Sequence, residues 1–189
     1  AQQYALDYPQ HVEALALINT GTNLMDATPF GPALRQAVKQ TAEVGDRTFF
    51  ESRNSQLRNP PQAGLFGKPT PEAVEQLRQR NEAISAALQE TSDDDLFTYS
   101  TGMLRNQAAF IGFDYTSRLS EIKMPVCIVH GNADTVVPFE YGQALHRGIS
   151  QSELFEIESA DHGVLSWPDA ADAFREWVLS TISTAQTVS

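Results

Sequence analysis

Cysteine is almost absent from this chain of 189 residues, which contains only Cys127. A single cysteine excludes an internal disulfide framework. Its place in the apolar run 126–129 favours a small buried side chain over a reactive thiol. Few cysteines suit a reducing compartment, and we therefore expect a cytoplasmic protein.

Basic residues and long apolar runs are also scarce. The 13 Lys and Arg residues are outnumbered by 24 Asp and Glu residues, which gives a net charge of −11. Such a surface repels phosphate backbones and anionic lipids, so we expect neither nucleic acid nor a membrane as a partner. No apolar run approaches the roughly 18 residues that span a bilayer. The first ten residues, AQQYALDYPQ, lack the basic and apolar regions of a signal peptide.

The hydrophobic pattern divides the chain into three parts. Residues 1–21 predict a helix followed by a short buried strand over 12–18. Residues 22–120 contain recurring helical patterns, including a long helix that Thr70 caps at its start. Residues 121–189 alternate strand, helix, strand and helix, which predicts parallel strands in an α/β sheet.

The three consecutive aspartates 93–95 have two interpretations. They could suggest a metal site, but Ser92 before them favours a helix N-cap followed by carboxylates that complement the helix dipole. We expect no metal and no cofactor, because the sequence has neither a ligand cluster nor a glycine-rich phosphate loop.

Polar residues follow two of the expected strands. Asp134 comes after the apolar run 126–129, and His162 comes after the next strand along the chain. Ligands of open α/β sheets bind beyond the carboxyl ends of the strands, and neighbouring strands lie about 4.8 Å apart. A carboxylate against one imidazole nitrogen fixes the tautomer and leaves the other nitrogen as a general base.

Three simpler interpretations stay open for these residues. Asp134 could be a turn residue that bonds its own backbone, as aspartate often does. His162 could be an ordinary surface histidine beside Gly163. His130, which ends the earlier strand, could compete as the base.

The segments VHGNADTVVP and SADHGVLSWPDAADAFREWV resemble the last third of α/β-hydrolase-fold enzymes. AQQYALDYPQHVEALALINTG resembles the helix and strand that follow the nucleophile elbow, and 22–120 matches the helical cap that many members insert there. The resemblance implies the C-terminal part of an α/β-hydrolase sheet with an inserted helical cap. It implies Asp134 as the triad acid and His162 as the base.

The nucleophile of that family lies in a G-x-S-x-G turn, which this sequence lacks. Ser100, in TYSTG, lacks the first glycine of the motif. We therefore expect the chain to begin just after the elbow and to be inactive alone. The N-terminal half of the hydrolase domain would then be a separate chain or a missing segment.

The resemblance implies hydrolysis of a small apolar ester, lactone or related substrate by a Ser-His-Asp triad. Val136 and Val137, next to Asp134, are candidate pocket residues, as are Phe97 and Met103 in the cap. Aromatic residues at helical spacing can equally be core residues. Two alternatives stay open: a non-catalytic ligand-binding or receptor module, and a dehalogenase or epoxide hydrolase with an aspartate nucleophile.

Overall fold

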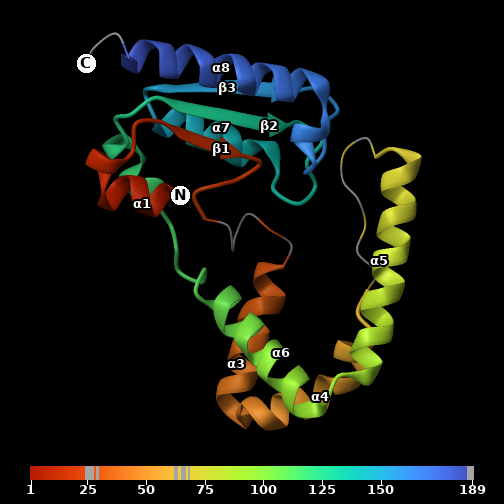
Figure 1. Cartoon of the computed structure of the whole chain (residues 1–189). Helices are drawn as coiled ribbons and strands as arrows, with labels where there is room; N and C mark the ends of the chain where they lie inside the picture. Colours follow the sequence, from red (N-terminus) through yellow and green to blue (C-terminus); the bar gives the residue numbers. More distant parts are fainter. Residues whose placement is uncertain (24–27, 29, 62–63, 65–66, 68, 187–189) are drawn as a thin grey trace. The chain divides into compact units, whose positions relative to one another are not determined.

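The computed structural model describes residues 1–23, 28, 30–61, 64, 67 and 69–186. The chain forms two compact units. The first comprises 1–28, 66–68 and 113–189, and the second comprises 29–65 and 69–112. The elements of both are labelled in Figure 1.

The first unit is built on a parallel three-stranded sheet, as the sequence predicts. Its strands, in spatial order, are β1 (Leu15–Ile18), β2 (Val126–Gly131) and β3 (Ser152–Ile157). β2 lies in the centre and all six of its residues are buried, as expected of a strand covered on both faces. β1 begins later than the expected residue 12, because Pro9–His11 form a 3-10 turn, η1, and Val12 ends it.

Helices cover both faces of this sheet (Figure 1). The helices are α1 (Gln2–Asp7), α7 (Phe139–Gly148) and α8 (Pro168–Gln186), with short 3-10 turns η2 (Thr116–Glu121) and η3 (Val164–Ser166). Alternate residues of β2 point to opposite faces. Those on one face pack with α1, η2 and α7, and those on the other pack with α8. The first core includes Leu15, Leu17, Leu119, Val126, Ile128 and Leu145, and the second includes Cys127, Val129, Ile157, Ala170 and Trp177.

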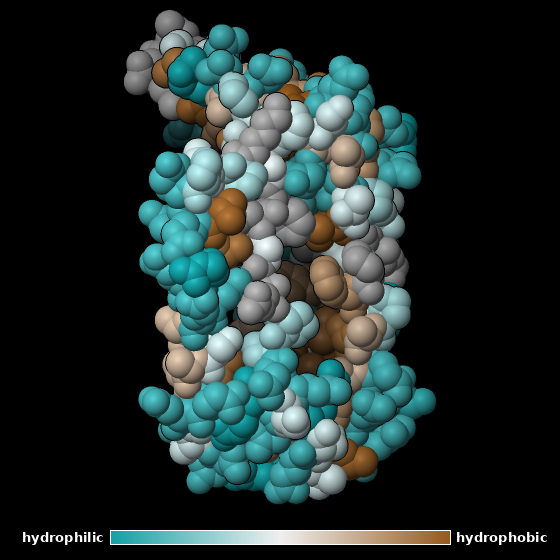
Figure 2. Space-filling view, turned by 90° about the vertical axis from the view of Figure 1, so that its right-hand side faces the viewer, coloured by the Kyte–Doolittle hydropathy of each residue, from teal (hydrophilic) through white to brown (hydrophobic). Residues whose placement is uncertain are grey.

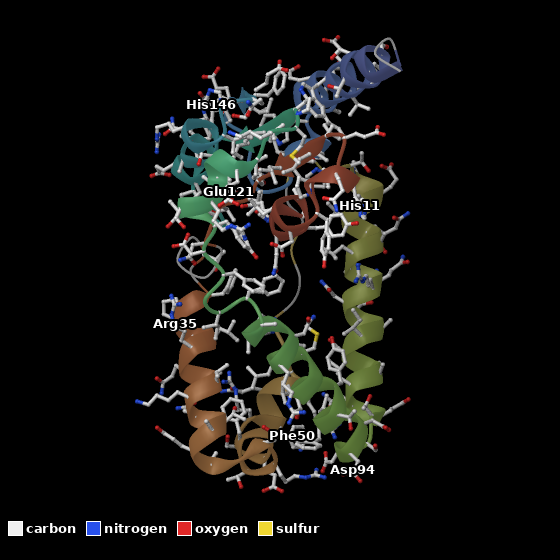
Figure 3. All side chains as sticks on the ribbon, turned by 90° about the vertical axis from the view of Figure 1, so that its left-hand side faces the viewer. His11, Arg35, Phe50, Asp94, Glu121 and His146 are labelled. Atoms are coloured by element: carbon white, nitrogen blue, oxygen red, sulfur yellow. The ribbon has the colours of Figure 1, made fainter. Side chains whose placement is uncertain are left out.

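The second unit consists of helices in its described part. They are α3 (Gly31–Val44), α4 (Asp46–Arg58), α5 (Pro71–Glu90) and α6 (Asp93–Ala108). Phe50 of α4, labelled in Figure 3, is buried and meets the ring of Phe97 edge-on at 5.5 Å between centroids. The guanidinium of Arg47 lies over the Phe97 ring at 4.2 Å.

Both expected helix caps are present in this unit. The Thr70 hydroxyl accepts from the amide of Ala73, and the Ser92 hydroxyl accepts from the amide of Asp95. Each cap satisfies an amide that the first helical turn leaves without a partner. The unit is narrower than the expected stretch 22–120, because 113–120 pack with the sheet and Leu119 joins its core.

The outer surface is rich in hydrophilic side chains, as the face in Figure 2 shows. Among the residues that the structure describes, no helix combines the length and apolar character needed to cross a bilayer.

Candidate active site

Asp134 lies in the loop that follows β2, and it is buried. Its Oδ1 atom accepts hydrogen bonds from the amides of Val136 at 2.7 Å and Val137 at 2.9 Å. These bonds form the local turn that aspartate commonly makes with the backbone two residues on. They fix the direction of the carboxylate and leave Oδ2 for another partner.

That partner is His162, in the loop after β3. The distance from His162 Nδ1 to Asp134 Oδ2 is 2.8 Å, which is a short charge-assisted hydrogen bond. A carboxylate only accepts, so Nδ1 carries the proton and the lone pair of the neutral ring is on Nε2. The two residues meet because β2 and β3 are parallel neighbours whose carboxyl ends lie at the same edge. The turn interpretation and the pairing of Asp134 are therefore both correct, one for each oxygen.

Two asparagines hold the strand ends together. Asn19 ends β1 with a φ of 42°; its side chain accepts from the Gly131 amide and donates to the Asp161 carbonyl, both at 3.0 Å. Asn132 follows β2, and its side-chain oxygen accepts from the Ser159 amide at 2.8 Å. The pattern had shown these residues only as strand ends. Their long-range partners give them a second role, which is to hold the acid and base loops in place.

The loop before His162 is fixed by a further carboxylate. Asp161 accepts from the amide of Gly163 at 2.9 Å, and both its oxygens lie within 2.8 Å of the Gly67 amide. Asp161 thus binds backbone on both sides of its own loop and restricts the position of His162.

His130 does not provide a base that substrate can reach. It is fully buried, and its Nε2 donates to the Val137 carbonyl at 2.9 Å. Burial, opposed by that hydrogen bond and by Asp134, lowers the pKa of His130, so the ring is held neutral.

The candidate pocket residues lie in both units. Val136 is half-buried and Val137 buried in the acid loop. Phe97 and Met103 lie on α6 in the helical unit, and Met103 is exposed. Their role in a pocket stays a prediction. Ser100 is also on α6, where its hydroxyl donates to the Phe97 carbonyl.

The aspartates 93–95 open α6 as the cap interpretation predicts. Asp93 pairs with Arg58 at 2.5 Å and Asp94 pairs with Arg47 at 2.7 Å. The hydrogen bond from Arg58 lowers the pKa of Asp93. Within the described ranges, no group of three His, Cys, Asp or Glu side chains is arranged to hold a metal ion.

The sequence model of the alpha/beta hydrolase fold family matches residues 1–169. The chain belongs to this family. The match includes both loops of the Asp134–His162 pair, so the resemblance seen in the sequence is confirmed.

The curated relatives of this α/β hydrolase bear the names of hydrolases. It is 25% identical over 183 residues to 2-hydroxy-6-oxononadienedioate/2-hydroxy-6-oxononatrienedioate hydrolase 1 of Pseudomonas putida, covering 97% of this chain and 59% of the relative. It is 38% identical over 64 residues to the AB hydrolase superfamily protein YisY of Bacillus subtilis, covering 34% of this chain and 24% of that protein.

Solved structures show the same fold. A hydrolase from Pseudomonas aeruginosa PA01 matches with a TM-score of 0.53 and 23% identity, over 96% of this chain and 59% of that one. A bromoperoxidase from Bacillus anthracis matches with a TM-score of 0.55 and 22% identity, over 96% and 62%. This α/β hydrolase therefore spans about three fifths of the length of the relatives that match nearly all of it.

Proposed function

We propose that this chain supplies the acid and the base of a hydrolase active site. The 2.8 Å bond between His162 Nδ1 and Asp134 Oδ2 carries the proposal. It joins the ends of two neighbouring strands, while two amides hold the other carboxylate oxygen. Asp134 orients the ring and stabilises the imidazolium, and His162 Nε2 acts as the general base.

The reaction proposed is a two-step hydrolysis. A serine hydroxyl gives its proton to His162 Nε2 while its oxygen attacks the carbonyl carbon of the substrate. The imidazolium then returns the proton to the leaving alkoxide, and an acyl-enzyme remains. In the second step, water gives a proton to the same nitrogen and attacks the acyl carbon; the acid product leaves and the serine recovers its proton.

The serine is proposed to lie outside these 189 residues, in the N-terminal half of the hydrolase domain. That half is either a separate chain or another segment of the same protein. The relatives' greater length supports this proposal, since the chain corresponds to 59% of the Pseudomonas putida hydrolase.

The edge of β1 gives this proposal a second support. Within the described residues, β1 pairs with β2 only, and an open strand edge is a surface that other chain segments cover. A groove of about 500 Å³ runs beside it. Its lining comes from the start of β1 and from α8, and includes Val12, Ala14, Ala16, Phe174 and Trp177.

The proposed substrate is a small apolar ester, lactone or related compound. The names of relatives support this class: one curated relative hydrolyses a 2-hydroxy-6-oxo acid, and one similar structure is an enol-lactonase from Burkholderia xenovorans. The helical unit is proposed as the cap over this site, with Val136, Val137, Phe97 and Met103 as pocket residues.

The function is tested by hydrolysis of p-nitrophenyl esters. We expect no turnover by the 189-residue chain alone, and turnover once the polypeptide encoded upstream of Ala1 is included. Turnover by the chain alone through a serine would contradict the proposed location of the nucleophile. An intact, folded extended protein that binds esters without turnover would instead identify a ligand-binding module. An aspartate in the elbow encoded upstream would redirect the proposal to haloalkanes or epoxides.

A further inference from the structure

His130 is buried directly beneath the loop that carries Asp134. It is the fifth residue of β2 and none of its surface is exposed. Its ring meets Phe139 of α7 edge-on, at 5.7 Å between centroids. A histidine this deep is costly unless its polar atoms have a task, because buried polar groups lose their hydration.

The hydrogen bond of His130 closes the acid loop. Its Nε2 lies 2.9 Å from the Val137 carbonyl, which only accepts, so Nε2 carries the proton. The amide of Val137 donates to Asp134 Oδ1. Val137 is therefore held from below through its carbonyl, while its amide holds the carboxylate.

The surroundings of the ring permit one uncharged form. His130 Nδ1 is buried and has no hydrogen-bond partner among the described residues. A proton on Nδ1 would point at α7 without an acceptor, which is unfavourable in the interior. His130 Nε2 is also 3.8 Å from Asp134 Oδ2, too far for a hydrogen bond but close enough to compete for that oxygen if the ring were charged.

Gly142 makes the space for this ring. A Cβ atom at Gly142 would lie 2.5 Å from His130 Nδ1 and 3.0 Å from its Cγ. The helix therefore needs glycine here, although glycine in a helix interior is normally unfavourable.

We propose that His130 is a positioning residue for the Asp134–His162 pair. As an uncharged Nε2–H donor it fixes the turn that aims Asp134, and it leaves Asp134 Oδ2 to His162. Gly142 belongs to the same device because it sets the position of the ring. The inference rests on the proposed function for its catalytic consequence only, since its geometry can be measured without any turnover.

The test is histidine NMR on the 189-residue chain with isotope-labelled histidine. In the wild-type chain we expect His130 in the Nε2–H form, and His162 in the Nδ1–H form with a downfield proton resonance. His130→Leu removes the donor, so we expect loss of the His162 Nδ1–H resonance. His130→Gln restores an Nε2–H that can reach the Val137 carbonyl, so we expect the resonance to return.

A glycine pair provides the matched comparison. Gly142→Ala displaces the His130 ring, and we expect it to weaken or abolish the His162 resonance. Gly102→Ala, in the interior of α6 with nothing within 4 Å of its added Cβ, is the control and leaves the resonance unchanged.

A folded His130→Leu chain that keeps the His162 resonance would overturn the inference. If His130→Leu does not fold, the other two variants decide it. The inference is equally overturned if Gly142→Ala folds with the resonance intact, or if His130→Gln folds without it. None of these results affects the proposed function, which fails separately if the extended protein does not hydrolyse esters.

Discussion

The two oxygens of Asp134 have different partners, and this division explains why one residue suits two interpretations of its sequence. Oδ1 completes a local turn, and Oδ2 contacts a histidine 28 residues away. Local turn chemistry is visible in the sequence. The distant contact was predictable because parallel strands bring their carboxyl ends together.

Asp134→Asn isolates the orienting role of the carboxylate. The amide oxygen can still accept from Val136 and Val137, but an amide NH₂ facing His162 favours the tautomer with its proton on Nε2. We expect ester turnover by the extended protein to fall by about 10⁴-fold, the loss seen when such an orienting acid is replaced. Steady-state kinetics measures this loss.

Asp161→Asn is the matched control for that variant. Asp161 is the neighbouring acid, and its recorded partners are the amides of Gly67 and Gly163. Its amide oxygen can still accept from them, so we expect turnover within about tenfold of wild type, a change of about 1.4 kcal/mol in the barrier. Equal losses in the two variants would remove the special role of Asp134.

Cys127 gives a prediction that depends on pH. Burial, followed by the charge of Glu153, raises the pKa of this thiol from about 9 to about 12. The protonated thiol therefore stabilises the fold fully below pH 9, and this contribution is lost as pH rises from 9 to 12. We expect the native thiol to resist Ellman's reagent at pH 8 and to react after unfolding in guanidinium. Rapid reaction of the native protein would contradict its burial.

At the scale of elements, hydrophobic patterning predicts most of the fold. Alternation of strand and helix after residue 121 gives β2, α7, β3 and α8, because parallel strands read as apolar runs and amphipathic helices repeat with their own period. The start of β1 was less predictable, since Val12 and Ala14 are as apolar as the strand itself but follow a 3-10 turn.

The roles of Asn19 and His130 could not be predicted in the same way. Asn19 bonds residues 112 and 142 positions away, and no local pattern specifies which strand end its amide will meet. His130 was assigned a structural place, but its donor role depends on how the acid loop folds back over β2. Both depend on tertiary geometry, which patterning does not contain.

Gly131→Ala tests whether the close approach of the two loops matters. A Cβ at Gly131 would lie 2.2 Å from the Ala160 carbonyl oxygen, which is rigid backbone beside the histidine loop. We expect a loss of about 1–3 kcal/mol in the free energy of unfolding, as in overpacked cores, together with a weaker Asp134–His162 contact. Urea denaturation measures it.

Gly64→Ala is its control, because nothing lies within 4 Å of a Cβ added there. We expect this change to be within about 0.5 kcal/mol of wild type. If Gly131→Ala were as mild as Gly64→Ala, the two loops would not be held as closely as the structure indicates.

At the scale of the whole molecule, the sheet unit contains two members of a three-member site. A base and its orienting acid cannot attack a carbonyl without a nucleophile. The open edge of β1 and the greater length of the relatives both support a further segment beside this sheet. The account therefore predicts that chemistry appears only when that segment is present.

Labelling with a fluorophosphonate tests this central claim most directly. The reagent bonds covalently to a serine that a nearby histidine activates. We expect labelling of the protein that includes the polypeptide encoded upstream of Ala1, and loss of labelling in its His162→Ala variant. An extended, folded protein that remains unlabelled, or one whose labelling persists without His162, would contradict the account.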